Sequence, residues 1–181
     1  MSVTRLDGVA VFDQLPDHEA EQFLVSCCGA SAWVQAMLAR RPFGSVARIL
    51  AAADDIWWSL ESADWREAFD HHPRIGERVA AVPQGDAARG WSADEQRGTS
   101  SASDATRRAL AEANAEYERR FGYIFLVCAT GKSADEMLAL LRQRLTNDPA
   151  TELRVAAGEQ AKITRLRLEK LFRVSSTASG S

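Results

Sequence analysis

The sequence predicts an all-α fold, a single-domain bundle of about seven to nine helices. Apolar residues recur at helical spacing in most segments, for example at Val46, Ile49 and Ala53, and this spacing is typical of helices with one buried face. The one run that looks like a buried strand, residues 123–129, has no second run of its kind to pair with. A lone strand leaves its backbone hydrogen-bonding groups unsatisfied, so this run does not indicate a sheet.

Size and composition favour one domain with its own core. The chain has 181 residues, of which 46% are hydrophobic, and we expect residues 1–174 to form this domain and residues 175–181 a disordered tail. A formal net charge of -3 argues against nucleic acid and anionic membranes as partners. Three cysteines, two of them adjacent, do not make a disulfide framework. Reduced thiols, with no apolar run of signal-peptide or membrane-spanning length, favour a cytoplasmic protein.

The first part of the sequence predicts an irregular lead-in segment followed by two helices. Residues 9–15 have no clear period and are expected to be irregular. Asp17 is placed to cap the first helix, over roughly residues 18–28. The second helix has Arg40 and Arg41 in its last turn, where cations complement the helix dipole.

Two further helices lead to the segment of most chemical interest. Ser45 is expected to cap one of them and Ser62 the other, which is short. The short helix should end at Asp70, because Pro73 disfavours the helical conformation in the residue before it. We therefore expect His72 in an extended conformation just past a helix end.

The middle of the chain predicts a loop and then two helices. Residues 75–90 contain glycine and proline without a clear period, so we expect a loop there. Residues 92–96 open the next helix. A long helix then starts at Ser103 or Asp104 and ends before Gly122, which is placed to be its C′ residue.

The last third predicts a buried connection between helices. Residues 123–129 are expected to be an extended core segment or a buried helical turn. Ser133 and Glu136 form a capping box at the start of a helix. Asp148, followed by a proline, caps a long helix that runs to about Phe172.

The pair His71-His72 is the first candidate for chemistry. A histidine held in a loop after a helix is a natural general acid or base, but it can also simply cap the helix carbonyls. We expect no metal site, because adjacent residues in an extended segment point apart. A nucleophilic pair of Cys128 with His72 is disfavoured, because Cys128 lies in the most apolar stretch and buried cysteines are usually inert.

Ser92 and Glu95 have two interpretations that the residues alone leave open. Their spacing is that of a capping box, in which the glutamate bonds back to the first backbone amide of the helix. Free amides at a helix start also bind anionic groups, so an acid there can help to hold a polar substrate.

Four motifs occur in order along the chain. They are His72-Pro73-Arg-Ile-Gly76, Ser92-x-x-Glu95-Gln96, Phe121-Gly-x-x-Phe125-x-x-Cys128-Ala129 and Lys162-Ile163-x-x-Leu166-Arg167-Leu168. With these motifs the sequence resembles the OHCU decarboxylase family, whose members act on 2-oxo-4-hydroxy-4-carboxy-5-ureidoimidazoline in urate breakdown. The resemblance implies an all-helical enzyme without a cofactor, commonly a homodimer, that releases carbon dioxide and forms (S)-allantoin.

The resemblance also implies roles for individual residues. His72 would be the catalytic general acid, Glu95 would orient the substrate or its proton, and Arg167 would bind the anionic substrate. Arg165, two positions away and so on a different helix face, is the weaker candidate. The residues implied to line the substrate pocket are Pro73, Ser92, Ala93, Asp94, Glu95, Gln96, Phe125, Leu126, Val127, Cys128 and Ala129. The alternatives are a non-catalytic helical binding module for a purine-derived ureide and a metal-dependent ureide hydrolase.

Overall fold

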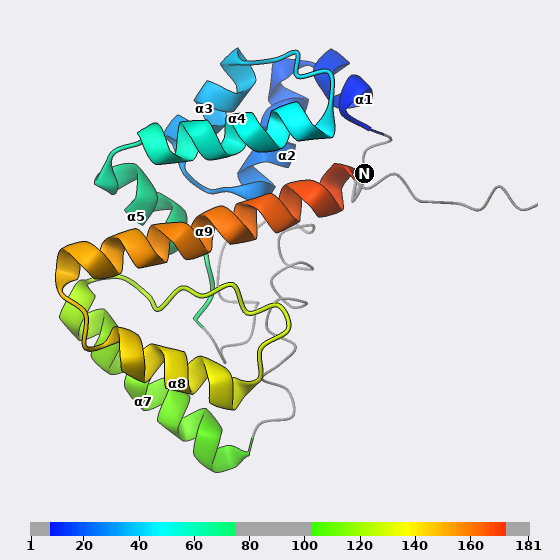
Figure 1. Cartoon of the computed structure of the whole chain (residues 1–181). Helices are drawn as coiled ribbons and strands as arrows, with labels where there is room; N and C mark the ends of the chain where they lie inside the picture. Colours follow the sequence, from blue (N-terminus) through cyan, green and yellow to red (C-terminus); the bar gives the residue numbers. More distant parts are fainter. Residues whose placement is uncertain (1–7, 75–102, 173–181) are drawn as a thin grey trace, which may run out of the picture.

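The computed structural model describes residues 8–74 and 103–172, and in these two ranges it contains eight helices and no strand (Figure 1). The predicted all-α class is therefore confirmed. The helices are α1 (Val9–Gln14), α2 (Asp17–Cys27), α3 (Ser31–Ala39), α4 (Val46–Ser59), α5 (Ser62–Asp70), α7 (Asp104–Phe121), α8 (Ala134–Arg144) and α9 (Pro149–Phe172). The predictions for residues 75–90, residues 92–96 and the tail 175–181 lie outside the described residues.

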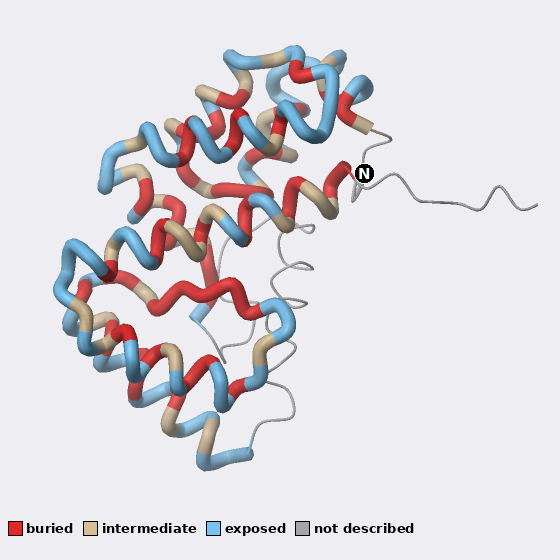
Figure 2. Tube along the Cα trace, viewed as in Figure 1, coloured by how far each residue is buried: buried red, intermediate tan, exposed pale blue. Residues whose placement is uncertain are grey.

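Helix α9 runs through the middle of the molecule, with α1 to α5 on one side and α7 and α8 on the other (Figure 1). It packs against α2, α4 and α5, while α7 and α8 pack against each other. The buried faces of the helices turn toward this central helix, and exposed residues follow the outer faces (Figure 2). Both halves of the molecule therefore share α9, and a side chain on it can meet residues far away in the sequence.

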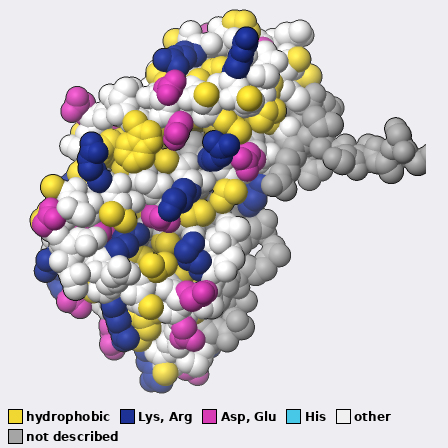
Figure 3. Space-filling view, in the orientation of Figure 1, with side chains coloured by type: hydrophobic (Ala, Val, Ile, Leu, Met, Phe, Trp, Pro, Cys, Tyr) yellow, Lys and Arg dark blue, Asp and Glu magenta, His cyan; other side chains and the backbone are white. Residues whose placement is uncertain are grey.

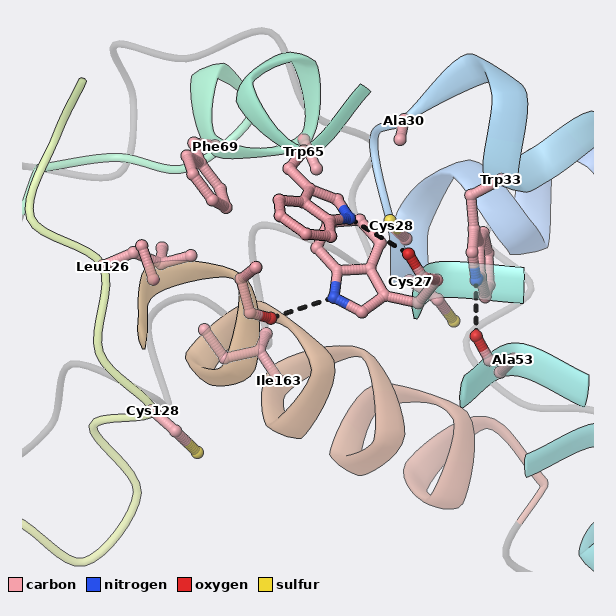
Figure 4. Close-up of a cluster of buried hydrophobic side chains, with 14 of the residues drawn as sticks. Cys27, Cys28, Ala30, Trp33, Ala53, Trp65, Phe69, Leu126, Cys128 and Ile163 are labelled. Atoms are coloured by element: carbon pink, nitrogen blue, oxygen red, sulfur yellow. Dashed lines mark hydrogen bonds between the residues drawn. The ribbon is translucent and has the colours of Figure 1, made fainter. Parts of the chain in front are cut away.

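Three buried tryptophans join the helices of the N-terminal half (Figure 4). The indole N–H of Trp33 donates to the carbonyl of Ala53 at 3.1 Å, and that of Trp57 donates to Ala157 at 3.0 Å. Trp65 donates to the carbonyl of Trp57 at 3.0 Å. A buried indole needs such a partner, so these bonds fix how α3, α4, α5 and α9 approach one another.

Most of the predicted helix caps are confirmed. The hydroxyls of Ser45 and Ser103 accept backbone amides at the starts of α4 and α7. Ser133 forms the predicted capping box with Glu136, and Asp148 accepts the first amides of α9. Gly122 ends α7 in the left-handed region, with φ of 78°, which a side chain would disfavour.

The expected irregular lead-in at residues 9–15 is wrong, because residues 9–14 form helix α1. This helix buries Val9 and Phe12, and the Phe12 ring meets the edge of Phe172 with their centroids 5.4 Å apart. The last turn of α9 therefore stabilises a helix that is too short to form by itself.

Three local predictions about polar residues in the N-terminal half are also wrong. Asp17 lies inside α2 and caps nothing; its carboxylate pairs with Arg41 instead. Arg41 lies beyond the end of α3, and its guanidinium donates to backbone carbonyls at the end of α1. Ser62 is the first residue of α5, whose cap is Glu61.

Residues 123–129 are extended and largely buried. Of the two predicted alternatives, the extended core segment is therefore confirmed, and the buried helical turn is wrong. Side chains, not a second strand, satisfy backbone groups of this segment. Arg144 Nη1 donates to the carbonyl of Leu126 at 2.6 Å, and Glu159 Oε2 accepts the amide of Cys128 at 2.7 Å. These bonds explain how an all-α protein can bury an extended apolar run.

Arg144 also belongs to a polar group that we call the ion-pair cluster: the buried Arg144, Glu152 and Tyr117 and the half-buried Asn147. Arg144 Nε donates to Glu152 Oε1 at 2.7 Å, and Asn147 Nδ2 donates to Glu152 Oε2 at 2.8 Å. The Tyr117 hydroxyl donates to Glu152 Oε1 as well. The cluster joins α7, α8 and α9, and burial raises the pKa of the Tyr117 hydroxyl well above its ordinary value.

Candidate active site

His72 lies just beyond the end of helix α5, as predicted. The helix ends at Asp70, and the backbone amides of His71 and His72 donate to the carbonyls of Ala68 at 3.2 Å and Phe69 at 3.1 Å. These bonds close the last turn and fix the backbone of His72 just beyond it. Only 8% of His72 is exposed.

One face of α9 presents polar side chains to this histidine. Gln160, Thr164 and Arg167 are spaced by four and three residues, which places them on the same side of the helix. Their exposed fractions are 0%, 5% and 3%. We call His72, Gln160, Thr164 and Arg167 the histidine cluster.

Hydrogen bonds connect three members of the histidine cluster. His72 Nε2 lies 2.7 Å from Gln160 Oε1, and Gln160 Nε2 donates to Thr164 Oγ1 at 3.0 Å. Thr164 also hydrogen-bonds the side chain of Cys28, at the end of α2. The polar chain therefore crosses from α5 through α9 to α2.

The histidine is neutral at ordinary pH. Burial lowers the pKa of His72 from 6.5 to about 3, and the positive charges of Arg167 and of a protonated His71 act in the same direction. The hydrogen bond to Gln160 opposes this shift but does not overcome it. An anion bound beside Arg167 would reduce the repulsion and raise the pKa of His72 again.

Arg167 reaches the end of α2 from α9. Its Nη1 donates to the carbonyl of Ser26 at 3.3 Å. Beside it, burial raises the pKa of Cys27 to about 12 and of Cys28 to about 11, so both thiols stay protonated although the guanidinium favours their thiolates. Protonated thiols do not act as nucleophiles or metal ligands.

Close packing holds the end of α5 against the α2–α3 connection. A Cβ atom added to Gly29 would lie 2.3 Å from Cγ of His71, so only glycine fits there. The Glu67 side chain on α5 accepts the amide and the hydroxyl of Ser31, at 3.1 and 2.5 Å. The close packing against Gly29 and the bonds from Glu67 to Ser31 thus both hold the end of α5, and with it His71, in place.

The structure brings two of the three predicted catalytic residues, His72 and Arg167, into one electrostatic environment. Pro73 and the residues from Phe125 to Ala129 are buried. The Phe125 ring packs 5.3 Å from Tyr117, centroid to centroid, with Arg144 Cζ 4.6 Å from its centre, so its own contacts are with the ion-pair cluster. Ser92, Ala93, Asp94, Glu95 and Gln96 lie outside the described residues.

Arg165 lies on a different face of α9 from Arg167. Its side chain is 59% exposed, and its Nε pairs with Glu169 at 3.2 Å. Arg167 is buried, and its charge acts on His72. The two arginines, two residues apart, therefore meet different surroundings.

Gln160, Thr164 and Glu159 were not predicted from the sequence. The available signal was the spacing of Gln160, Thr164 and Arg167 on a helix face that also carries the apolar Ala156 and Ile163. Glu159 anchors the amide of Cys128 and so holds the extended segment against the helix that carries the histidine cluster.

Three general observations concern the described ranges. Within them, no three His, Cys, Asp or Glu side chains gather closely enough to hold a metal ion. None of their helices has both the length and the apolar character needed to cross a membrane. The face seen in Figure 3 mixes basic and acidic side chains with hydrophobic ones and shows no large field of one charge.

The chain has known relatives over most of its length. A family model described as OHCU decarboxylase matches residues 13–169. The "Uric acid degradation bifunctional protein TTL" of Arabidopsis thaliana is 40% identical over 147 residues, which cover 81% of this chain and 45% of that protein. The chain thus spans less than half the length of this relative. The 2-oxo-4-hydroxy-4-carboxy-5-ureidoimidazoline decarboxylase of Amia calva is 32% identical over 145 residues, 76% of this chain and 78% of that protein.

Two solved structures are similar to this one. One is described as OHCU decarboxylase in the presence of (S)-allantoin; it has 37% identity and a TM-score of 0.72, and the match covers 83% of this chain and 97% of that one. The other, described as (S)-allantoin synthase, has 20% identity and a TM-score of 0.66, covering 91% of this chain and 54% of that one. At that identity the second likeness shows the fold alone.

Proposed function

The chain belongs to the OHCU decarboxylase family, and on this premise we propose that it converts 2-oxo-4-hydroxy-4-carboxy-5-ureidoimidazoline into (S)-allantoin and carbon dioxide, a carboxy-lyase reaction of urate degradation. The observation that carries the proposal is the burial of a neutral imidazole, His72, within the electrostatic reach of the buried guanidinium of Arg167. This pair offers one group to move protons and one to hold an anion.

The substrate needs little help to lose its carboxyl group. Its carboxylate lies beside a carbon–nitrogen double bond of the ring. When the bond to the carboxyl carbon breaks, its electron pair moves into that double bond, so the substrate is its own electron sink and this step requires no cofactor. The ring carbon then gains a proton, the hydroxyl group of the substrate loses one, and the ring nitrogen that received the electron pair takes one up from solvent. One proton is therefore consumed for each carboxylate lost as carbon dioxide.

His72 is proposed to carry this proton. Because its ring is neutral before the reaction, it must accept a proton before it can act as general acid. The hydroxyl group of the substrate is the proposed source, and the ring carbon is the acceptor. Burial and Arg167 disfavour the imidazolium, so the ring gives the proton up readily, and delivery from one side would give a single enantiomer.

Other residues are proposed to bind the substrate. The planar fork of Arg167 suits a carboxylate, and burial strengthens such a charged hydrogen bond. Glu95 is proposed to orient the substrate, and Pro73 with the stretch 125–129 to exclude water from it. A homodimer, which the resemblance implies, and a cytoplasmic location, which the free cysteines favour, are further parts of this proposal.

Replacing His72 by alanine tests the proposal. We expect the variant to remain folded and to form (S)-allantoin and carbon dioxide about 10²–10⁴-fold more slowly, the usual contribution of a positioned general acid. The measurement follows both products from freshly generated substrate. The control is His18→Ala, because the side chain of His18 is 74% exposed on α2, and it should leave the rate unchanged.

Three outcomes would overturn the proposal. Unchanged turnover by folded His72→Ala would remove His72 from the chemistry. Binding of the substrate by the unaltered protein without release of carbon dioxide would indicate a binding module. Loss of activity on treatment with a chelator would indicate a metal-dependent hydrolase.

A further inference from the structure

A neutral imidazole has one N–H group and one nitrogen lone pair, and the partner of one nitrogen decides the role of the other. In His72, Nε2 lies 2.7 Å from the carbonyl oxygen of Gln160, which can only accept a hydrogen bond. Nδ1 has no hydrogen-bond partner within residues 8–74 and 103–172. The contact with Gln160 therefore places the proton on Nε2 and the lone pair on Nδ1.

The orientation of the Gln160 amide follows from its second contact. Its nitrogen donates to Thr164 Oγ1 at 3.0 Å, so its oxygen faces His72. The Thr164 side chain also hydrogen-bonds Cys28. When the hydroxyl donates to the sulfur, its oxygen is left to accept from Gln160, and all three bonds donate in one direction, from the imidazole toward the sulfur.

An amide partner differs from the carboxylate that often accompanies a catalytic histidine, because it carries no charge. Among the described residues, the titratable groups that act on His72 are Arg167 from α9 and His71 from its own loop, and both favour the neutral ring. No carboxylate of the described ranges is among the groups that shift it. Gln160 thus orients the ring without stabilising the imidazolium, which a carboxylate would do.

We propose that Gln160 is a positioning residue that holds His72 as the Nε2–H tautomer, so that Nδ1 is the atom that takes up and returns the proton of the substrate. The assignment of the Nε2–H tautomer rests only on the contact between His72 Nε2 and Gln160 Oε1. The part that Nδ1 plays in the reaction rests on the proposed function.

The unaltered protein supplies the first test. The chain contains only three histidines, so the ¹⁵N NMR signals of selectively labelled histidine can be assigned with His18→Ala, His71→Gln and His72→Ala. We expect the Nδ1 signal of His72 at the position of an unprotonated ring nitrogen and Nε2 at that of an N–H nitrogen. The reverse pattern, or an imidazolium at pH 7, overturns the proposal.

Two nearly isosteric variants supply the second test. Gln160→Met removes the acceptor, so we expect both tautomers in the NMR spectrum. We expect kcat to fall about 10–100-fold with little change in KM, by analogy with the loss of the residue that orients a metal-binding histidine. Gln160→Glu adds a negative charge; we expect His72 to titrate at higher pH and the acidic limb of the kcat profile to move with it. The control is Gln143→Met, at an exposed position of α8.

The two proposals fail separately. If the ¹⁵N signals of His72 are the same in Gln160→Met as in the unaltered protein, the positioning role is wrong, whatever the activity. If the tautomer changes as expected while His72→Ala turns over normally, the positioning role stands and the proposed function is wrong. A fall in activity without movement of the tautomer or of the pH profile would assign Gln160 a purely structural role and contradict the proposal.

Discussion

The histidine cluster and the ion-pair cluster both bury polar side chains against α9, but they balance charge in opposite ways. In the ion-pair cluster the cation Arg144 lies against the carboxylate of Glu152, which also accepts from Tyr117 and Asn147. In the histidine cluster an uncharged imidazole lies beside a cation, and its hydrogen-bond partner is an amide.

This difference separates a structural role from a chemical one. A cluster whose charges neutralise each other holds its helices together and gains little from a ligand. A cluster in which a cation disfavours the charged form of its neighbour changes its protonation when an anion arrives. Burial of polar residues is therefore a weak sign of an active site by itself, and the balance of charge within the cluster is more informative.

The largest expected effect comes from breaking the ion-pair cluster. Glu152→Leu leaves the charge of Arg144 buried without its partner, which should lower the free energy of unfolding by about 3–5 kcal/mol. Urea denaturation measures this change. Adding Arg144→Met to the same protein removes the buried charge and should restore part of the loss. Glu112→Leu, at an exposed position of α7, is the control and should change stability by less than about 0.5 kcal/mol.

A smaller effect is expected from crowding the histidine cluster. Gly29→Ala places a Cβ 2.3 Å from the ring of His71, so the ring must move; overpacking of this kind costs about 1–3 kcal/mol. Because His72 is the next residue, we also expect turnover to fall. Gly158→Ala is the matched control, since nothing lies within 4 Å of its added Cβ, and it should stabilise α9 by about 0.4–1 kcal/mol. Equal behaviour of the two variants would contradict the close packing at Gly29.

The third expected effect is the pH dependence that His72 adds to stability. Its pKa is about 3 in the folded protein and near 6.5 when exposed, so between these values the unfolded chain binds one more proton. Stability from this group is therefore complete above pH 6.5 and falls as the pH is lowered, by up to about 1.4 kcal/mol per pH unit. Denaturation at pH 7, 6 and 5 should show a shallower slope for His72→Gln than for the unaltered protein or His18→Gln. Parallel slopes would mean that His72 is not buried as a neutral ring.

The sequence predicted best the features that neighbouring residues decide. Ser45, Ser133 and Asp148 were predicted as caps because a cap bonds its own helix a few residues away. Helix α1 was missed because its stability comes from contact of Phe12 with Phe172, at the other end of the chain. Local propensity contains no information about such a contact.

The candidate site divides in the same way. His72 and Arg167 were found through motifs, because histidine and arginine carry recognisable chemistry. Gln160 and Thr164 are ordinary helix residues, and only the folded structure shows that their face of α9 is buried against His72. Glu159 accepts a backbone amide of the extended segment, and this contact also exists only once the helices have packed. The sequence alone therefore could not predict it.

The extended segment 123–129 also bears on how the protein avoids aggregation. A seven-residue apolar run with strong β-propensity is the kind of sequence that joins with copies of itself in amyloid-like sheets. Here Arg144 and Glu159 already occupy a carbonyl and an amide that a neighbouring molecule would need. The charged side chains that fix the segment thereby act as gatekeepers against self-association.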